Sequence, residues 1–110
     1  MSKKYLIYLR DINTSIKNIN EFIQGMTLDQ FISDDKTSSA VIRKFEIIGE
    51  ASKNIPEEIK EKYPQIPWKD IAGMRDKLIH AYSKVDLTLV WKTIHKRLPE
   101  LKSFIDDFLE

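Results

Sequence analysis

The chain contains no cysteine and only three glycines among its 110 residues. Without cysteine it forms no disulfide, thiolate nucleophile or cysteine-ligated metal site, so redox chemistry through protein thiols is excluded. The glycines, at positions 25, 49 and 73, are too far apart for a glycine-rich phosphate loop, and no serine lies in a nucleophile-elbow context. Nucleotide hydrolysis through either of those motifs is therefore excluded.

Long apolar runs and an excess of one charge are also missing. The N-terminal apolar stretch YLIYL is interrupted by Arg10 and Asp11 and is too short for a signal-peptide core or a membrane span. We therefore expect a cytoplasmic protein that makes no membrane contact. Lys and Arg total 18 and Asp and Glu total 17, a net charge of +1, so any site for a polyanion such as RNA has to be a local patch.

The composition that is present, 42% hydrophobic and 32% charged, is typical of one soluble globular domain. We predict a single domain over residues 1–110. A chain of this size buries roughly two thirds of the surface that it exposes when unfolded, so its core provides only a small margin of stability. Dimerisation would add to that margin.

Apolar residues recur at three- and four-residue steps in five segments, and no segment alternates with the period of two that a strand requires. The sequence therefore predicts an all-α bundle. The first helix should run from about residue 3 to 24 and end at Gly25. A turn or short helix within 27–36 should follow, and then a loop in the polar segment SDDKTSS.

From residue 39 onward, the sequence predicts four further helices and one connector. One helix should lie in residues 39–55, where Gly49 would permit close approach of a neighbouring helix. A short helix should begin at Pro56, and the two prolines of YPQIPW should make a rigid connector. A helix should follow from Trp68, and a last helix capped by Asp86 should be kinked by Pro99 rather than divided.

The histidines, His80 and His95, are the only side chains with an ordinary pKa near neutral pH. They are fifteen residues apart on different predicted helices, and no carboxylate spacing matches a metal motif, so we expect no metal site and no cofactor. His95 lies beside a small basic cluster of Lys92, Lys96 and Arg97. That cluster could guide a polyanion, but it is more typical of a solvated helix face.

The segment GMRDKLIHAY concentrates polar side chains on one short helix: Arg75, Asp76, His80 and Tyr82. Asp76 and His80 are four apart and adjacent on a helix, so Asp76 could orient the imidazole. Arg75 and His80 are separated by roughly 140°, so they converge only if the helix loosens near His80 or a second chain closes the site.

Arginine and histidine together suit cleavage of an RNA phosphodiester. His80 could take the 2′-hydroxyl proton or protonate the leaving 5′-oxygen, while Arg75 stabilises charge on the phosphoryl oxygens. No metal is required for this chemistry. The spacing also fits a purely structural arrangement, in which Arg75 pairs with Asp76 or Asp70, His80 caps the helix and Tyr82 packs at an edge.

RDKLIHAY resembles the R-x4-H-x-Y signature of the HepT-like branch of the HEPN domains, the toxins of bacterial and archaeal toxin–antitoxin modules. Three other blocks resemble the family in the same order: FEIIGEASKNIP, IPWKDIAGMR and VDLTLVWKTI. The resemblance covers almost the whole chain. It implies a compact HEPN-type bundle of four to five helices that forms a homodimer and acts as a metal-independent ribonuclease.

Residue by residue, the resemblance implies that Arg75 and His80 are catalytic in a cleft shared by two subunits. It also implies a partner, a minimal nucleotidyltransferase antitoxin that silences the toxin by transferring AMP to Tyr82, as in a type VII-like module. Bulky anions there would occupy the phosphate site and repel RNA. Asp76 departs from the asparagine frequent in the family, and Ala81 from an acidic residue; Asp76 could lower the local positive potential or raise the His80 pKa.

A second function fits the same residues. The chain could be a non-catalytic helical interaction module that binds a nucleotidyltransferase partner or a nucleotide through the same motif. Growth arrest on expression that is lost in His80→Ala would support only the enzyme. A third possibility, the nucleotidyltransferase itself, is opposed by the lack of a paired-aspartate metal motif next to a Gly-Ser loop.

Overall fold

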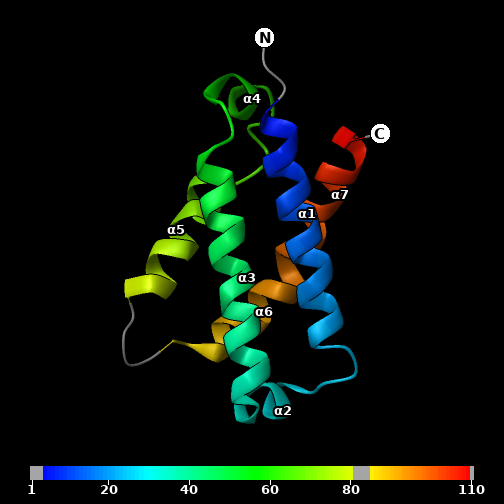
Figure 1. The fold of residues 1–110 in the computed structure, drawn as a ribbon, viewed down its shortest axis with the longest axis vertical. Helices are drawn as coiled ribbons and strands as arrows, with labels where there is room; N and C mark the ends of the chain where they lie inside the picture. The colour runs from blue at the N-terminus through cyan, green and yellow to red at the C-terminus, as the bar shows by residue number, and fades with distance from the viewer. Residues whose placement is uncertain (1–3, 81–84, 110) are drawn as a thin grey trace.

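The computed structural model describes residues 4–80 and 85–109, apart from the side chains of 78–80 (Figure 1). The regular structure in these ranges is entirely helical, which confirms the all-α prediction. The described residues form more helices than the four to five expected, because the short elements are distinct helices and the last one is divided. The seven are α1 (Tyr5–Phe22), α2 (Leu28–Ser33), α3 (Asp35–Lys53), α4 (Glu57–Lys62), α5 (Trp68–His80), α6 (Leu87–Lys96) and α7 (Leu98–Leu109).

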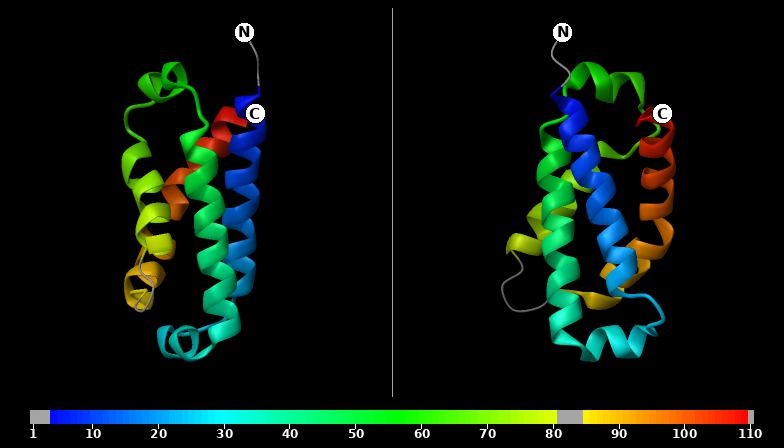
Figure 2. Two further views of the ribbon diagram at one scale, coloured as in Figure 1. Left: turned by 60° about the vertical axis from the view of Figure 1, so that its left-hand side comes forward. Right: turned by 45° about the vertical axis from the view of Figure 1, so that its right-hand side comes forward.

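The frame of the bundle is the antiparallel pair α1 and α3, and α5 packs on the other side of α3 (Figure 2). The apolar stripe predicted for the first helix is fully buried at Leu9, Ile12, Ile16 and Ile19. The predicted stripe of α3 is buried too, at Val41, Phe45, Ile48 and Ser52, and α3 packs against α1. Each buried aliphatic side chain contributes about 1.5–3 kcal/mol, so these two stripes fix how α3 is rotated about its axis.

The connection from α1 to α3 is tighter than the sequence suggested. Gly25 has φ +77°, the left-handed conformation expected of a glycine that ends a helix. The loop predicted in SDDKTSS is wrong, because Asp34 alone separates α2 from α3. Its carboxylate accepts hydrogen bonds from the backbone N–H of Thr37 at 3.0 Å and its hydroxyl at 2.9 Å, so α3 begins at Asp35. The polar residues of that segment cap and start a helix instead of forming a loop.

The prediction of a non-helical connector before α5 is confirmed. Residues 63–67 are not helical, and the indole Nε1 of Trp68 donates a hydrogen bond to the carbonyl of Tyr63 at 3.2 Å. The rings of Tyr63 and Phe104 pack edge-on with their centroids 4.8 Å apart, and this contact joins the connector to α7. These contacts set where α5 starts, and so where its later turns lie against α3.

The prediction of one kinked helix at the C-terminus is wrong. Pro99 has no N–H to donate to the carbonyl of His95, and the helix is interrupted at Arg97, so α6 and α7 run in different directions (Figure 2). The cap is as expected, since the Asp86 carboxylate accepts from the Leu89 N–H at 3.0 Å. The changed direction lets α6 pack on α2, through Phe31 and Trp91, while α7 returns along α1. No helix in the described part of the chain is long and apolar enough to span a membrane.

Candidate functional site

The site begins at the point where α5 crosses α3. A Cβ built on Gly49 would overlap the Cβ of Arg75 and lie 3.0 Å from its Cγ. Only a residue without a side chain fits there, which confirms that Gly49 permits close helix approach. Arg75 therefore leaves α5 in direct contact with the backbone of α3, and the base of its side chain has a fixed position.

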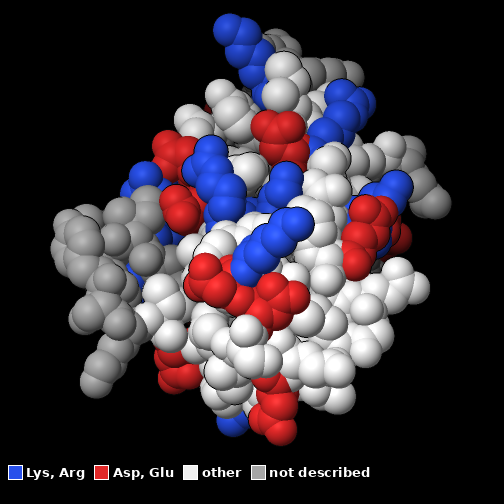
Figure 3. Space-filling model, turned by 60° about the horizontal axis from the view of Figure 1, so that its bottom comes forward, with Lys and Arg blue, Asp and Glu red and all other residues white. Residues whose placement is uncertain are grey.

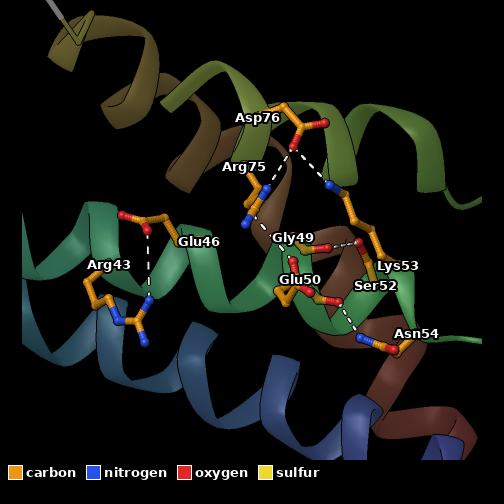
Figure 4. Close-up of polar contacts among 9 residues, drawn as sticks. All are labelled: Arg43, Glu46, Gly49, Glu50, Ser52, Lys53, Asn54, Arg75 and Asp76. Carbon is orange, nitrogen blue, oxygen red and sulfur yellow. Dashed lines mark hydrogen bonds and ion pairs between the residues drawn. The ribbon is translucent and has the colours of Figure 1, made fainter. Parts of the chain in front are cut away.

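Two carboxylates lie against the Arg75 guanidinium (Figure 4). Its Nε is 3.5 Å from Oε2 of Glu50 on α3, and its Nη1 donates to Oδ1 of Asp76 at 3.1 Å. Nε is buried, and the Glu50 contact lacks hydrogen-bond geometry, so Nε has an ionic neighbour but no hydrogen bond. The arginine is held on two sides by opposite charge.

Lys53 completes the cluster. It lies on α3 one turn after Glu50, and its Nζ donates to Oδ1 of Asp76 at 2.8 Å. Two hydrogen bonds lower the pKa of Asp76 below its ordinary value. The bond from Lys53 has the larger effect, and the bond from Arg75 has the next largest. Two cations and two anions therefore alternate across the α3–α5 contact, and their formal charges cancel.

Local hydrogen bonds shape α3 beneath this cluster. The Ser52 hydroxyl, fully buried, donates to the carbonyl of Gly49 at 2.7 Å, and the Asn54 amide donates to the carbonyl of Glu50 at 2.9 Å. These bonds satisfy carbonyls in the last turns of α3, where intrahelical donors run out. The surface that carries Gly49 and Glu50 is therefore held by the helix beneath it.

A pocket of about 230 Å³ opens beside Arg75. Its walls come from α1 and α3, and charged groups of both signs alternate around it, including the Arg43–Glu46 ion pair at 3.7 Å. Such a pocket suits a polar ligand that presents both donors and acceptors. The other lining residues are Tyr8, Asp11, Ile47, Glu50, Ala51 and Asn54.

The structure places two of the four predicted site residues. Arg75 and Asp76 form an ion pair, which is one of the pairings expected if the motif has a purely structural role. His80 is the last helical residue of α5, but its side chain lies outside the described residues, and so does Tyr82. The predicted pairing of Asp76 with His80 is thus not described, and the described partners of Asp76 are Lys53 and Arg75.

Sequence reasoning missed Glu50 and Lys53. The signal was present: a Glu and a Lys three residues apart on one helix, next to a glycine, complement an adjacent Arg and Asp on another. Finding it needed the pairing of α3 with α5, which the sequence did not supply. The contact at Gly49 sets the register of the two helices.

The second histidine lies in ordinary helical surroundings. His95 Nδ1 is 2.8 Å from the carbonyl oxygen of Trp91, and its ring is tilted by 46° against the indole, with ring centroids 4.6 Å apart. The nearby Lys92, Lys96 and Arg97 are exposed, as on a solvated helix face. Within residues 4–77 and 85–109, no three His, Asp or Glu side chains come together in a way that could hold a metal ion. On the face in Figure 3, charges of both signs are interspersed, so a single-sign field is absent there.

The described residues form an all-helical bundle with a HEPN-like fold. Residues 12–108 match the family described as "Ribonuclease HepT-like". The chain belongs to this family.

Three relatives show how closely the chain follows the family. The "Probable ribonuclease HepT" of Thermococcus cleftensis is 50% identical over 102 residues, which cover 93% of each chain. A "Putative RNase" of Caldanaerobacter subterraneus is 43% identical over 103 residues, covering 94% of this chain and 92% of the relative. A "Gamma-glutamylcyclotransferase and putative RNase" of Methanocaldococcus jannaschii is 47% identical over 110 residues, 100% of this chain and 50% of that one. No solved structure gave a significant match.

Proposed function

We propose that this protein is a metal-independent endoribonuclease and the toxin of a type VII-like toxin–antitoxin module. Residues 1–110 act as one domain, in the cytoplasm, on an RNA substrate. Arg75 and His80 are its catalytic residues, and Tyr82 accepts AMP from a minimal nucleotidyltransferase antitoxin. Family membership supports the ribonuclease activity, and the R-x4-H-x-Y spacing in the sequence supports these residue roles.

The observation that carries the proposal is the placement of Arg75. A guanidinium fixed at a helix crossing, 29% exposed and next to a pocket, is prepared to bind an anionic oxygen without losing much side-chain freedom. An arginine needed only for a surface ion pair would not require a glycine beneath it. The phosphoryl group of RNA is the anion that the family assignment favours.

The reaction balances without a metal ion. A base takes the proton of the 2′-hydroxyl, the 2′-oxygen attacks the neighbouring phosphorus, and the P–O5′ bond breaks. The leaving 5′-oxygen takes a proton, so the products end in a 2′,3′-cyclic phosphate and a 5′-hydroxyl. His80 serves as this base or this acid, and Arg75 stabilises the charge that grows on the phosphoryl oxygens.

A homodimer would supply the second motif of the shared cleft. A groove of about 720 Å³ lies between α5 and the α6–α7 junction, and its walls are mainly apolar, with Leu89 47% exposed. An exposed apolar side chain in such a groove is available for contact with a partner. We propose that the second subunit covers this groove, because α5, the helix that carries Arg75, forms one of its walls.

AMP transfer would silence the enzyme by charge and bulk. The Tyr82 hydroxyl oxygen bonds to the α-phosphorus of ATP, and pyrophosphate leaves. Tyr82 is seven residues after Arg75, so a nucleotide attached there would compete with RNA for the positive site.

The alternative function is a non-catalytic helical module that binds a nucleotidyltransferase or nucleotide. The ion pairs of Arg75 with Glu50 and Asp76 favour it, since they occupy the guanidinium without any ligand. Expression in a cell without the antitoxin separates the two functions. Growth arrest by the wild type, but not by equally abundant His80→Ala, supports the ribonuclease; no arrest from a folded, unmodified wild type supports the module.

A further inference from the structure

Arg75 has to present its guanidinium in one orientation if it is to stabilise a phosphoryl group. The contact with Gly49 fixes only the start of the side chain, because rotatable bonds remain beyond Cγ. The orientation of the far end depends on the groups that touch its nitrogens. Those groups are Glu50 at Nε and Asp76 at Nη1.

The two carboxylates reach the guanidinium from different helices. Asp76 is adjacent to Arg75 on α5, so it moves together with the arginine, whereas Glu50 belongs to α3. The Glu50 contact therefore joins the guanidinium directly to the wall of the pocket that α3 forms, whereas Asp76 is tied to α3 only through Lys53. Nε is buried with no hydrogen bond, and Glu50 Oε2, 3.5 Å away, needs to move only slightly to accept one.

We infer that Glu50 is a positioning residue that orients the Arg75 guanidinium for the RNA phosphate. Asp76 supports it from the other side, and Lys53, at 2.8 Å, holds Asp76 in place. This inference rests on the proposed ribonuclease function and adds to it a residue of α3 that does not itself touch the substrate.

The charges of the cluster give the inference a distinctive kinetic signature. Glu50, Lys53, Arg75 and Asp76 sum to zero, and Glu50→Gln leaves one net positive charge beside the phosphate site. RNA should then bind as tightly as before or more tightly, because phosphate contacts dominate nucleic-acid affinity. Turnover should fall about tenfold or more, because misplacing a catalytic group by about 1 Å can cost about 10²-fold.

Glu46 offers a matched control. It lies one turn before Glu50 on α3, lines the same pocket and pairs with Arg43 instead of Arg75. Glu46→Gln therefore removes the same charge from the same wall without releasing Arg75. The Glu50 side chain is 57% exposed and that of Glu46 is 27% exposed, and glutamine has nearly the size of glutamate, so both variants should keep the fold, which thermal unfolding checks.

The experiment measures kcat and KM for RNA cleavage, together with the arginine Nε–H signals in nitrogen-15 NMR spectra of the RNA-free protein. Arg75→Lys identifies the Arg75 signal by its loss. We expect Glu50→Gln to lower kcat without raising KM and to shift that signal, whereas Glu46→Gln should leave the Arg75 signal in place and lower kcat by much less. Equal kcat in the two glutamine variants, or an unshifted Arg75 signal in Glu50→Gln, would overturn the inference.

The two readouts separate its failure from that of the proposed function. If the unmodified wild type does not cleave RNA, the ribonuclease proposal fails, and the assignment of Glu50 as a positioning residue for cleavage fails with it. The NMR comparison still shows whether Glu50 orients Arg75. If the wild type cleaves and Glu50→Gln matches it in kcat, only the inference about Glu50 fails.

Discussion

Gly49 and Arg75 are in direct contact: the space that a side chain on Gly49 would need is filled by the Cβ of Arg75. The glycine costs α3 some intrinsic stability, since glycine in a helix interior is about 1 kcal/mol less favourable than alanine. In return, the backbone of one helix supports the arginine of another. The contact places Arg75 between Glu50 and Asp76, whose charges hold its far end.

Replacing the two glycines inside helices should have opposite effects. Gly73→Ala should stabilise the protein by about 0.5–1 kcal/mol, because a Cβ there meets no atom of another described part of the subunit within 4 Å. Gly49→Ala should destabilise it by about 1–2 kcal/mol, because overpacking against Arg75 exceeds the gain in helix propensity. Thermal or urea unfolding of both variants measures this. If Gly49→Ala proves as stable as Gly73→Ala, the contact with Arg75 is not close.

Removing the negative charge of Asp76 should strengthen RNA binding. In Asp76→Asn, the positive charges of Lys53 and Arg75 are no longer balanced by this carboxylate. Affinity for a non-cleavable 2′-deoxy RNA analogue should rise several-fold at low salt, and the gain should shrink as salt is added. A titration followed by fluorescence anisotropy at two salt concentrations tests this. Unchanged affinity at low salt would mean that the cluster does not contact the backbone of the nucleic acid.

Acid should destabilise the protein through carboxylates with lowered pKa values. Hydrogen bonds from Thr37 lower the pKa of Asp34, and those from Lys102 and Asn13 lower that of Asp106. Because both pKa values are lower in the folded protein, the stability that they contribute is present above about pH 3.8, the ordinary aspartate value, and is lost as pH falls through the folded values.

The melting temperature of Asp106→Asn should therefore change less with acid than that of the wild type, measured between pH 7 and pH 2. Asp107→Asn, one residue further along α7, is the matched control. The ion pair of Asp106 with Lys102 at 3.0 Å and the hydrogen bond from Asn13 at 3.0 Å are specific to the first position. Equal acid sensitivity of the two variants would argue against those contacts in solution.

A charge in the groove should separate the proposed dimer. Leu89→Glu should give a folded monomer by sedimentation and remove RNA cleavage, since Leu89 lines the groove between α5 and the α6–α7 junction. Ile7→Glu is the control, because Ile7 is an exposed apolar residue of α1, 57% exposed, and does not line that groove. Full activity in a folded Leu89→Glu monomer would contradict the shared cleft.

The sequence predicted most of the fold because most of it is decided locally. The stripes of α1 and α3, the left-handed turn at Gly25, the cap at Asp86 and the connector before Trp68 depend on residues close together in the chain. The errors arose where tertiary packing chose between two locally acceptable conformations. Asp34 could begin a loop or cap a helix, and Pro99 could bend a helix or divide it.

The site was less predictable, because its parts come from two helices. Arg75 and Asp76 follow from their own segment, but Glu50 and Lys53 join them only through the crossing of α3 and α5. Hydrophobic periodicity reports which face of each helix is buried, but not the height at which two helices meet. Gly49 was the one residue that pointed to a close crossing, and the sequence did not identify its partner.

The central claim is that Arg75 and His80 cleave RNA without a metal ion. The most direct test incubates mixed cellular RNA in EDTA with purified wild type, Arg75→Ala and His80→Ala, after intact mass has confirmed that each is unmodified. We predict cleavage by the wild type, with 2′,3′-cyclic phosphate ends, and none by either folded variant. Intact RNA after incubation with an unmodified, folded, dimeric wild type would contradict the claim, as would undiminished cleavage by either variant.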